Sequence, residues 1–326
     1  MPASRRNFLR GALAAGVLSR LSPAQSPVTR TAGEELWYNK PAGRWLEALP
    51  VGNGRLGGMV YGGVQMERIA LSESTAWSGA PATGEVNPDA LTHLDEIRQL
   101  FFAGRYDEAQ KLCGKYLPGH SKNFGTNLPL PELELTFGAV EKPTQYRRSL
   151  DLAEAIAHVS FGSGSAIFRR EILASHADGV LAIRLTCSEP GRIGFRMGFS
   201  EGVLPSTVRG RGRDTLILQG HAWEHMHSTG HDGVAVQISA RIVAEGGGIT
   251  LANQAMEVRG ANAVTVLVAV GTSFGGAVPE DLCKRALQRA ASRDFAHFRR
   301  AHIADYQAFY RRTSLDLGDS LPAVRR

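Results

Sequence analysis

Short runs of hydrophobic residues, separated by glycines and other turn-forming residues, dominate the middle of the chain. From Glu132 to Val270 they recur at the spacing of roughly 8–12 residues that is typical of antiparallel β-sheets. From Val234 to Ile242 every second residue is apolar, which places these residues on one face of a strand. The expected strands are Leu56–Tyr61, Arg68–Leu71, Glu132–Phe137, Ala155–Phe161, Ala166–Ala174, Val180–Thr186, Arg192–Phe199, Thr215–Leu218, Val234–Val243 and Val264–Val270. So many evenly spaced strands predict a β-sandwich.

Other stretches follow a helical period. Between about Asp89 and Tyr116, apolar residues recur at three- and four-residue spacings, and Gly104 is expected to divide the stretch into two helices. Two further helices are expected at about Pro279–Ala291 and Ser292–Arg312. The predicted fold class is therefore mainly β, with inserted helices near 89–116 and two helices at the C-terminal end.

The first 24 residues have the pattern of a twin-arginine export signal. Arg5 and Arg6 precede a short apolar stretch and a further arginine, and Ala24 ends a small-residue cleavage site. The alternative is a disordered basic tail. Export predicts a periplasmic or secreted protein, with 25–33 as a linker, 34–278 as the sandwich domain and 279–326 as a helical linker.

Composition narrows the class of protein. The 326 residues are 43% hydrophobic and 21% charged, which excludes a disordered chain, and no apolar run is long enough to predict a membrane span. The formal charge of +6 falls to +2 without residues 1–24, which contain four arginines and no acidic residue. The run Arg209-Gly210-Arg211-Gly212-Arg213 is expected to be a glycine-spaced loop. Because no aromatic stacking platform accompanies it, nucleic acid is not an expected partner.

The cysteines show neither a disulfide framework nor a zinc-binding spacing. Cys113, Cys187 and Cys283 are odd in number and far apart. One disulfide is conceivable in an oxidising periplasm, but twin-arginine export carries proteins that folded in a reducing cytosol. Three buried free thiols are therefore expected.

A series of motifs occurs in one order from Leu36 to about Leu321. The string Gly52-Asn53-Gly54-Arg55-Leu56-Gly57 is followed by Trp77-Ser78-Gly79 and by Gly104-x-Tyr106-x-Glu108-Ala109. Later pieces are Tyr146-Arg147-Arg148-x-Leu150-Asp151-Leu152, Thr272-Ser273-Phe274 and Leu315-Asp316-Leu317-Gly318. This order resembles the N-terminal domain of glycoside hydrolase family 95, the inverting α-L-fucosidases. Two segments depart from the family pattern, Ser72–Gly79 and Pro131-Glu132-Leu133.

The resemblance implies a large β-super-sandwich, a helical linker and no cofactor. In that family an (α/α)6 barrel follows and holds the catalytic acid and base, and this chain is expected to stop where the barrel begins. No residue here matches the family's catalytic residues, so no catalytic residue is assigned.

Glu73 and Trp77 are the candidate substrate-rim residues. An aromatic face stacks on the C–H groups of a sugar while a carboxylate binds its hydroxyls, and Glu47 beside Trp45 is a second such pair. The alternative is that Trp37, Trp45 and Trp77 are core or interdomain anchors. Arg55 is expected to pair with Glu47 or Glu73, within a tight turn at Gly52-Asn53-Gly54 that requires positive φ.

Histidines gather between residues 221 and 231. The segment His221-x-x-Glu224-His225 matches an inverted zinc-protease pattern, and His227 and His231 lie nearby. That pattern binds zinc on a helix, whereas the flanking strands and glycines predict a long hairpin loop here. His221, His225 and His227 are retained as candidate metal ligands, and a solvated loop is the expectation.

The leading interpretation is the N-terminal domain of an exported α-L-fucosidase that is inactive alone. Its expected partners are a catalytic barrel, in cis or as a separate chain, and a fucosylated glycan bound through the complete enzyme. The alternative is a standalone carbohydrate-binding or structural module, and a metallopeptidase built on the histidines is a third reading.

Overall fold

The computed structural model describes residues 34–79, 86–119, 125–139, 142–202, 204–228, 233–252 and 254–315. Contacts between Cα atoms divide the chain into Met1–Glu34 and Glu35–Arg326, and the second unit contains the described helices and strands. The expected signal peptide (1–24) and linker (25–33) lie outside the described residues. None of the helices in the described ranges is long and apolar enough to cross a membrane.

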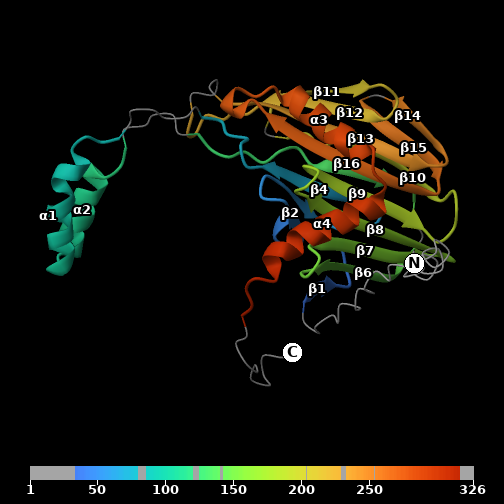
Figure 1. Cartoon of the computed structure of the whole chain (residues 1–326), viewed down its shortest axis with the longest axis horizontal. Helices are drawn as coiled ribbons and strands as arrows, with labels where there is room; N and C mark the ends of the chain where they lie inside the picture. The colour runs from blue at the N-terminus through green and yellow to red at the C-terminus, as the bar shows by residue number, and fades with distance from the viewer. Residues whose placement is uncertain are drawn as a thin grey trace, which may run out of the picture. The chain divides into compact units, whose positions relative to one another are not determined.

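Nine antiparallel strands form the larger sheet, in the order β1-β6-β7-β8-β9-β16-β13-β12-β11 (Figure 1). Their bounds are β1 Glu35–Tyr38, β6 Thr144–Asp151, β7 Ile156–Ser163, β8 Ala166–Ser175, β9 Val180–Cys187, β11 Ser206–Arg211, β12 Thr215–His221, β13 Ala235–Glu245 and β16 Ala263–Thr272. All ten residues of β16 are buried. This strand lies mid-sheet, between β9 and β13, and both of its faces are covered.

Seven antiparallel strands form the second sheet, in the order β14-β15-β10-β5-β4-β3-β2. Their bounds are β2 Leu49–Gly52, β3 Leu56–Val60, β4 Met66–Glu73, β5 Leu133–Phe137, β10 Ile193–Phe199, β14 Gly248–Ala252 and β15 Ala255–Ala261. The predicted β-sandwich is therefore confirmed.

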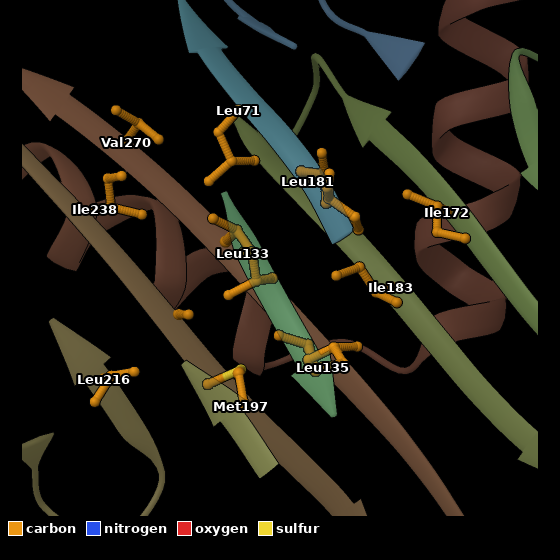
Figure 2. Packing of buried hydrophobic residues seen from close by; sticks show 14 of the residues in the cluster. Leu71, Leu133, Leu135, Ile172, Leu181, Ile183, Met197, Leu216, Ile238 and Val270 are labelled. Atoms are coloured by element: carbon orange, nitrogen blue, oxygen red, sulfur yellow. The ribbon is translucent and has the colours of Figure 1, made fainter. Parts of the chain in front are cut away.

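The main core fills the space between the two sheets. Leu71, Leu133, Leu135 and Met197 of the smaller sheet meet Ile172, Leu181, Ile183, Leu216, Ile238 and Val270 of the larger (Figure 2). Every second residue of β4 is buried, as are Leu133 and Leu135 of β5, because the period of a strand places alternate residues against the core. Burial of this apolar surface is the main source of stability for the fold.

Two helices cover the outer face of the larger sheet (Figure 1). Helix α3 (Pro279–Ala291) packs on β16 and β13, and α4 (Phe295–Tyr310) packs on β8. Asp294 caps α4 by accepting a hydrogen bond of 2.6 Å from the backbone N–H of His297. A second core thus forms outside the sandwich, with Cys283, Leu287 and Phe298 against the sheet.

The helical stretch near 89–116 is divided as expected. Helix α1 (Ala90–Phe102) and α2 (Tyr106–Tyr116) are separated by Gly104, whose φ of 72° suits glycine. Two single 3-10 turns complete the helices, η1 (Trp45–Glu47) and η2 (Phe274–Gly276).

Three sequence-based expectations need correction. The run 209–213 is not a loop throughout, because β11 extends to Arg211 and only Gly212, with φ of 63°, begins the turn. Strands β1, β2, β6, β14 and β15 were not expected at all. Of the three thiols, only that of Cys283 is buried; Cys113 and Cys187 are half-buried.

Candidate functional site

Glu73 lies at the end of β4, and its side chain is buried. Its carboxylate is 3.3 Å from Nη1 of Arg55 and accepts two hydrogen bonds of 2.6 Å from Thr75, from the backbone N–H and from Oγ1. The expected pairing of Arg55 with Glu73 is confirmed. Glu47 instead pairs with Arg44 and accepts from the backbone N–H of Gly43, which lowers the pKa of its carboxyl group.

Arg55 connects the two sheets near the end of β4. Arg55, Glu73, Thr75 and Trp77 are together called the Arg55–Trp77 corner. Its Nη2 donates to the carbonyl of Val270 on β16, while its side chain remains 40% exposed. Thr75 Oγ1 lies 2.5 Å from Oγ1 of Thr272, at the end of the same strand. The guanidinium is therefore fixed from behind by buried groups and presents its remaining surface to solvent.

Trp77 follows on the same segment and is 41% exposed. Its indole Nε1 donates to the carbonyl of Ser74, at 2.9 Å, and Ser74 in turn donates its backbone N–H to the carbonyl of Arg55. The indole is thus held next to the turn that carries Arg55. Asn127 supports this segment from behind, through a bond from Nδ2 to the carbonyl of Glu73.

The turn that holds Arg55 has the expected geometry. Gly54 has a φ of 87°, and Asn53 Oδ1 accepts from the backbone N–H groups of Arg55 and Leu56. Asn53 Nδ2 also donates to the carbonyl of Ser175, so the turn is tied to the β8–β9 connection. The sequence Gly52-Asn53-Gly54 is a structural turn, as predicted.

This arrangement suits binding rather than proton transfer. An exposed indole beside a fixed guanidinium is able to contact the apolar face and the hydroxyls of a sugar. Glu73 is saturated by Arg55 and Thr75, so its part is to orient Arg55. Of the two candidate rim residues, Trp77 is at the surface and Glu73 lies beneath it.

The other two tryptophans of the motif region are also at the surface. Trp37 is 56% exposed and Trp45 53% exposed, so neither is a core residue. Arg147 lies over the Trp37 ring, 4.7 Å from its centroid. The tryptophans were expected to be either core residues or interdomain anchors if they do not bind substrate, and their exposure excludes the core role.

The histidine segment forms a loop between β12 and β13, as expected. His221 ends β12, His225 packs edge-on against Trp223 at 4.1 Å, and Nδ1 of His227 lies 2.9 Å from Oγ1 of Thr126. Within the residues that the structure describes, no group of three or more histidine, cysteine or acidic side chains is arranged to hold a metal ion. His231 lies outside the described residues.

Glu224, in the same loop, joins it to the segment of Trp77. Its carboxylate accepts hydrogen bonds from Ser78 Oγ and from the backbone N–H groups of Met226 and His227. These donors lower the pKa of the carboxyl group. The sequence placed Glu224 in a metal motif, whereas its contacts make it a loop anchor.

Sequence reasoning missed a buried ion pair between the sheets. Nη1 of Arg170 on β8 lies 2.7 Å from Oε2 of Glu67 on β4, and both side chains are buried. Arg170 also donates to the carbonyls of Gly63 and Val64. The signal for this ion pair in the sequence is that Glu67 and Arg170 each occupy an inward-facing position of a strand. A charge buried in this way requires a partner of opposite charge.

Three curated relatives carry fucosidase names. "Alpha-L-fucosidase 2" of Arabidopsis thaliana is 28% identical over 316 residues, which cover 88% of this chain and 37% of that protein. "Probable alpha-fucosidase A" of Aspergillus niger is 30% identical over 165 residues, 48% of this chain and 20% of the relative. Its namesake in Aspergillus oryzae is 24% identical over 312 residues, 87% of this chain and 41% of the relative.

A solved structure of a candidate kojibiose phosphorylase from the human microbiome aligns with 85% of this chain and 38% of its own chain, at 11% identity and a TM-score of 0.45. The chain spans about two fifths of the length of the Arabidopsis and A. oryzae relatives.

The family described as "Glycosyl hydrolase family 65, N-terminal domain" matches residues 36–277. This range contains the strands of both sheets, apart from Glu35 of β1, and the Arg55–Trp77 corner. The N-terminal glycoside hydrolase domain expected from the motifs is confirmed by this match together with the fucosidase relatives. The chain therefore belongs to the N-terminal domain family of the family 65 glycosyl hydrolases.

Proposed function

We propose that this chain is the N-terminal domain of a secreted enzyme that hydrolyses α-L-fucosides in glycans, and that it is inactive alone. The observation that carries the proposal is its alignment, over 88% of its length, with a protein named "Alpha-L-fucosidase 2". The relatives' names supply the substrate class, and the domain itself is proposed to contribute structure and substrate contacts.

The proposed inactivity follows from the chemistry of the corner. Inverting hydrolysis needs an acid and a base separated by about 6.5–9.5 Å, both with access to the sugar. Glu73 is buried and accepts bonds from Arg55 and Thr75. A carboxylate held in this way neither protonates a leaving oxygen nor activates a water.

The proposed contribution of the domain is a binding rim. Trp77 would stack on a sugar face while Arg55 donates to its hydroxyls, next to a catalytic barrel present in cis or as a separate chain. Export by the twin-arginine route, directed by residues 1–24, would place the enzyme in the periplasm or outside the cell. No cofactor is proposed, since glycoside hydrolysis by two carboxylates needs none.

A standalone carbohydrate-binding or structural module is the second candidate, and one observation favours it. Phe298 of α4 is buried against the domain's own larger sheet, with Phe295 packed beside it. The C-terminal helices thus cover most of their apolar surface without a further domain. Only Phe309, which is 64% exposed, leaves a large ring open.

Two measurements on the purified chain separate these proposals. The first is hydrolysis of an aryl α-L-fucoside, with a buffer blank and a mock purification as controls. The second is retention on a column of fucosylated oligosaccharide, compared with the same oligosaccharide after removal of fucose. No hydrolysis and no retention support a domain that acts within a larger enzyme.

Fucose-dependent retention that Trp77→Ala abolishes and Trp37→Ala preserves supports the standalone module. Hydrolysis above both controls overturns the proposed inactivity.

A further inference from the structure

The outer face of β11, β12 and β13 carries a polar groove beside α3. Strand register places Arg209 opposite Ile217 and Ile217 opposite Ser239, while Arg211 is opposite Thr215 and Thr215 opposite Arg241. Cross-strand partners share one face of a sheet. Because Val208 packs against the core between the sheets, Arg209 and Arg211 lie on the outer face.

This basic groove has a volume of about 290 Å³. Arg211, Arg241 and the strand residues form one wall and the floor, and Lys284, Leu287 and Gln288 of α3 form the other wall. The volume is near the lower end of the usual range for ligand sites, roughly 300–1,000 Å³. It suits a single sugar ring rather than an extended polymer segment buried end to end.

The charge of the groove is positive. Arg241 pairs with Asp214 at 2.8 Å, and Arg211 pairs with Glu280 at 3.2 Å. Among the described residues, no acidic group forms an ion pair with Arg209 or Lys284. Lys284, which lines the groove, therefore remains available, and Arg209 is a second available cation on the outer face of β11, opposite Ile217 of the lining.

The floor is polar and already ordered. Gln237 is buried, accepts from Nε2 of Gln219 at 2.8 Å, and donates to Ser239 Oγ at 3.0 Å. Gln237 and Ser239 thus place buried polar groups in the lining of the groove, beside α3. Amide and hydroxyl groups in such a row match the hydroxyls of a sugar.

We propose that the basic groove binds a sugar ring that carries an anionic group, a carboxylate or a sulfate. Lys284 contacts the anionic group, with Arg209 at the rim opposite Ile217. Gln237, which Gln219 holds in place, and Ser239 contact the hydroxyls. A nucleic acid is the less suited ligand, because no aromatic side chain lines the groove to stack on a base. The site is separate from the Arg55–Trp77 corner and does not depend on fucosidase activity.

The test is calorimetric titration of the full chain at low ionic strength. The probes are trigalacturonate, a monosulfated galactotriose, neutral galactotriose and a single-stranded oligonucleotide. The variants are Lys284→Gln, in the lining of the groove, and Arg209→Gln, at its rim opposite Ile217. The control is Arg285→Gln, an exposed residue of α3 that lies outside the lining.

An anionic trisaccharide is expected to bind at least about tenfold more tightly than the neutral one, and each groove variant to lose about fivefold in affinity. The Arg285→Gln protein is expected to bind as the parent does. The stronger of the two anionic probes identifies the anionic group. Equal binding of the neutral sugar, no binding of either anionic sugar, unchanged affinity in both groove variants, or tighter binding of the oligonucleotide would each overturn the proposal.

Discussion

The guanidinium of Arg55 and the carboxylate of Glu73 lie 3.3 Å apart, at the corner of the sandwich where Arg55 also bonds to the carbonyl of Val270 on the larger sheet. The carboxylate also serves both donors of Thr75. Glu73→Ala is therefore expected to leave the half-buried donors of Arg55 and Thr75 without this acceptor, at a cost of about 1–3 kcal/mol in the free energy of unfolding. Denaturant titration measures this difference.

The control for that substitution is Asp95→Ala, which removes an exposed helix-surface pair with Arg98. Such pairs contribute roughly 0–1 kcal/mol. If the Glu73 variant is no less stable than the Asp95 variant, Glu73 does not stabilise the domain by holding Arg55 and Thr75.

Because α4 packs on the larger sheet, replacing a phenylalanine by alanine is expected to lower the free energy of unfolding strongly on its buried face and weakly on its exposed face. Phe298 is buried in the second core, so Phe298→Ala is expected to cost about 3–5 kcal/mol. Phe309→Ala, at an exposed position of the same helix, is the matched control and is expected to change stability by less than about 1 kcal/mol. Equal effects in chemical unfolding would contradict the docked position of α4.

Acid sensitivity is expected at the same interface. Burial lowers the pKa of His302 on α4 and of His158 on β7 beneath it. The unfolded chain then binds more protons than the folded one below the ordinary histidine pKa of about 6.5. The contribution of these histidines is complete above that value and is lost as pH falls through the folded pKa.

The groups that face the two histidines shape this response. His302 Nε2 donates to the carbonyl of Glu154, and Asp305 favours its charged form. Glu171 favours the charged form of His158, whereas Arg299 disfavours it. Burial is the largest influence on both pKa values, so it sets the direction.

The measurement is the difference in unfolding free energy between about pH 7.5 and about pH 5.5. It is expected to shrink in His302→Gln and to remain in His297→Gln, which alters an exposed histidine of α4. An identical difference in the two variants would contradict a role for His302.

Replacement of glycine by alanine is expected to lower the stability at Gly54 and to raise it at Gly114. Gly54 has a φ of 87°, so Gly54→Ala is expected to destabilise the domain by about 1–2 kcal/mol through backbone strain. Gly114 lies within α2 and a Cβ added there meets no atom within 4 Å. Gly114→Ala is expected to raise local stability by up to about 1 kcal/mol. Thermal and chemical unfolding of both variants check the signs.

Thiol reactivity is expected to differ among the three cysteines. Burial raises the pKa of Cys283 to about 11, so little thiolate is present near neutral pH. Alkylation of the native protein, followed by peptide mass spectrometry, should modify Cys113 and Cys187 and spare Cys283 until the chain unfolds. Rapid native labelling of Cys283 would show that α3 is not docked on the sheet.

Sequence patterns predicted the central strands and missed the four edge strands, together with β6 and β15, which lie next to edge strands. The apolar pattern of the sequence predicts strands β13 and β16 because they are buried in the middle of the sheet. Strand β1 has four exposed residues, and β11 carries Arg209 and Arg211 on its open face, so neither shows that pattern. Edge strands lack one neighbour and often carry charge, which removes the signal that burial imposes.

The sequence predicted which residues make up the Arg55–Trp77 corner, but it did not predict that Glu73 is buried. Motifs singled out Glu73 and Trp77, and proximity in sequence suggested Arg55. The burial of Glu73 depends on Val270 and Thr272, nearly two hundred residues away along the chain. Such long-range contacts follow from the sheet order, which local patterns do not contain.

That sheet order has a consequence for synthesis and folding. Strand β16 is inserted between β9 and β13, although β9 precedes it by about eighty residues and β13 by about thirty. Until a ribosome has released Thr272, the larger sheet has a gap at its centre and the inner faces of its two halves lack a shared neighbour. Contacts so distant in sequence make folding slow. The domain is thus expected to acquire its structure in one late step, after Thr272 has emerged, rather than strand by strand.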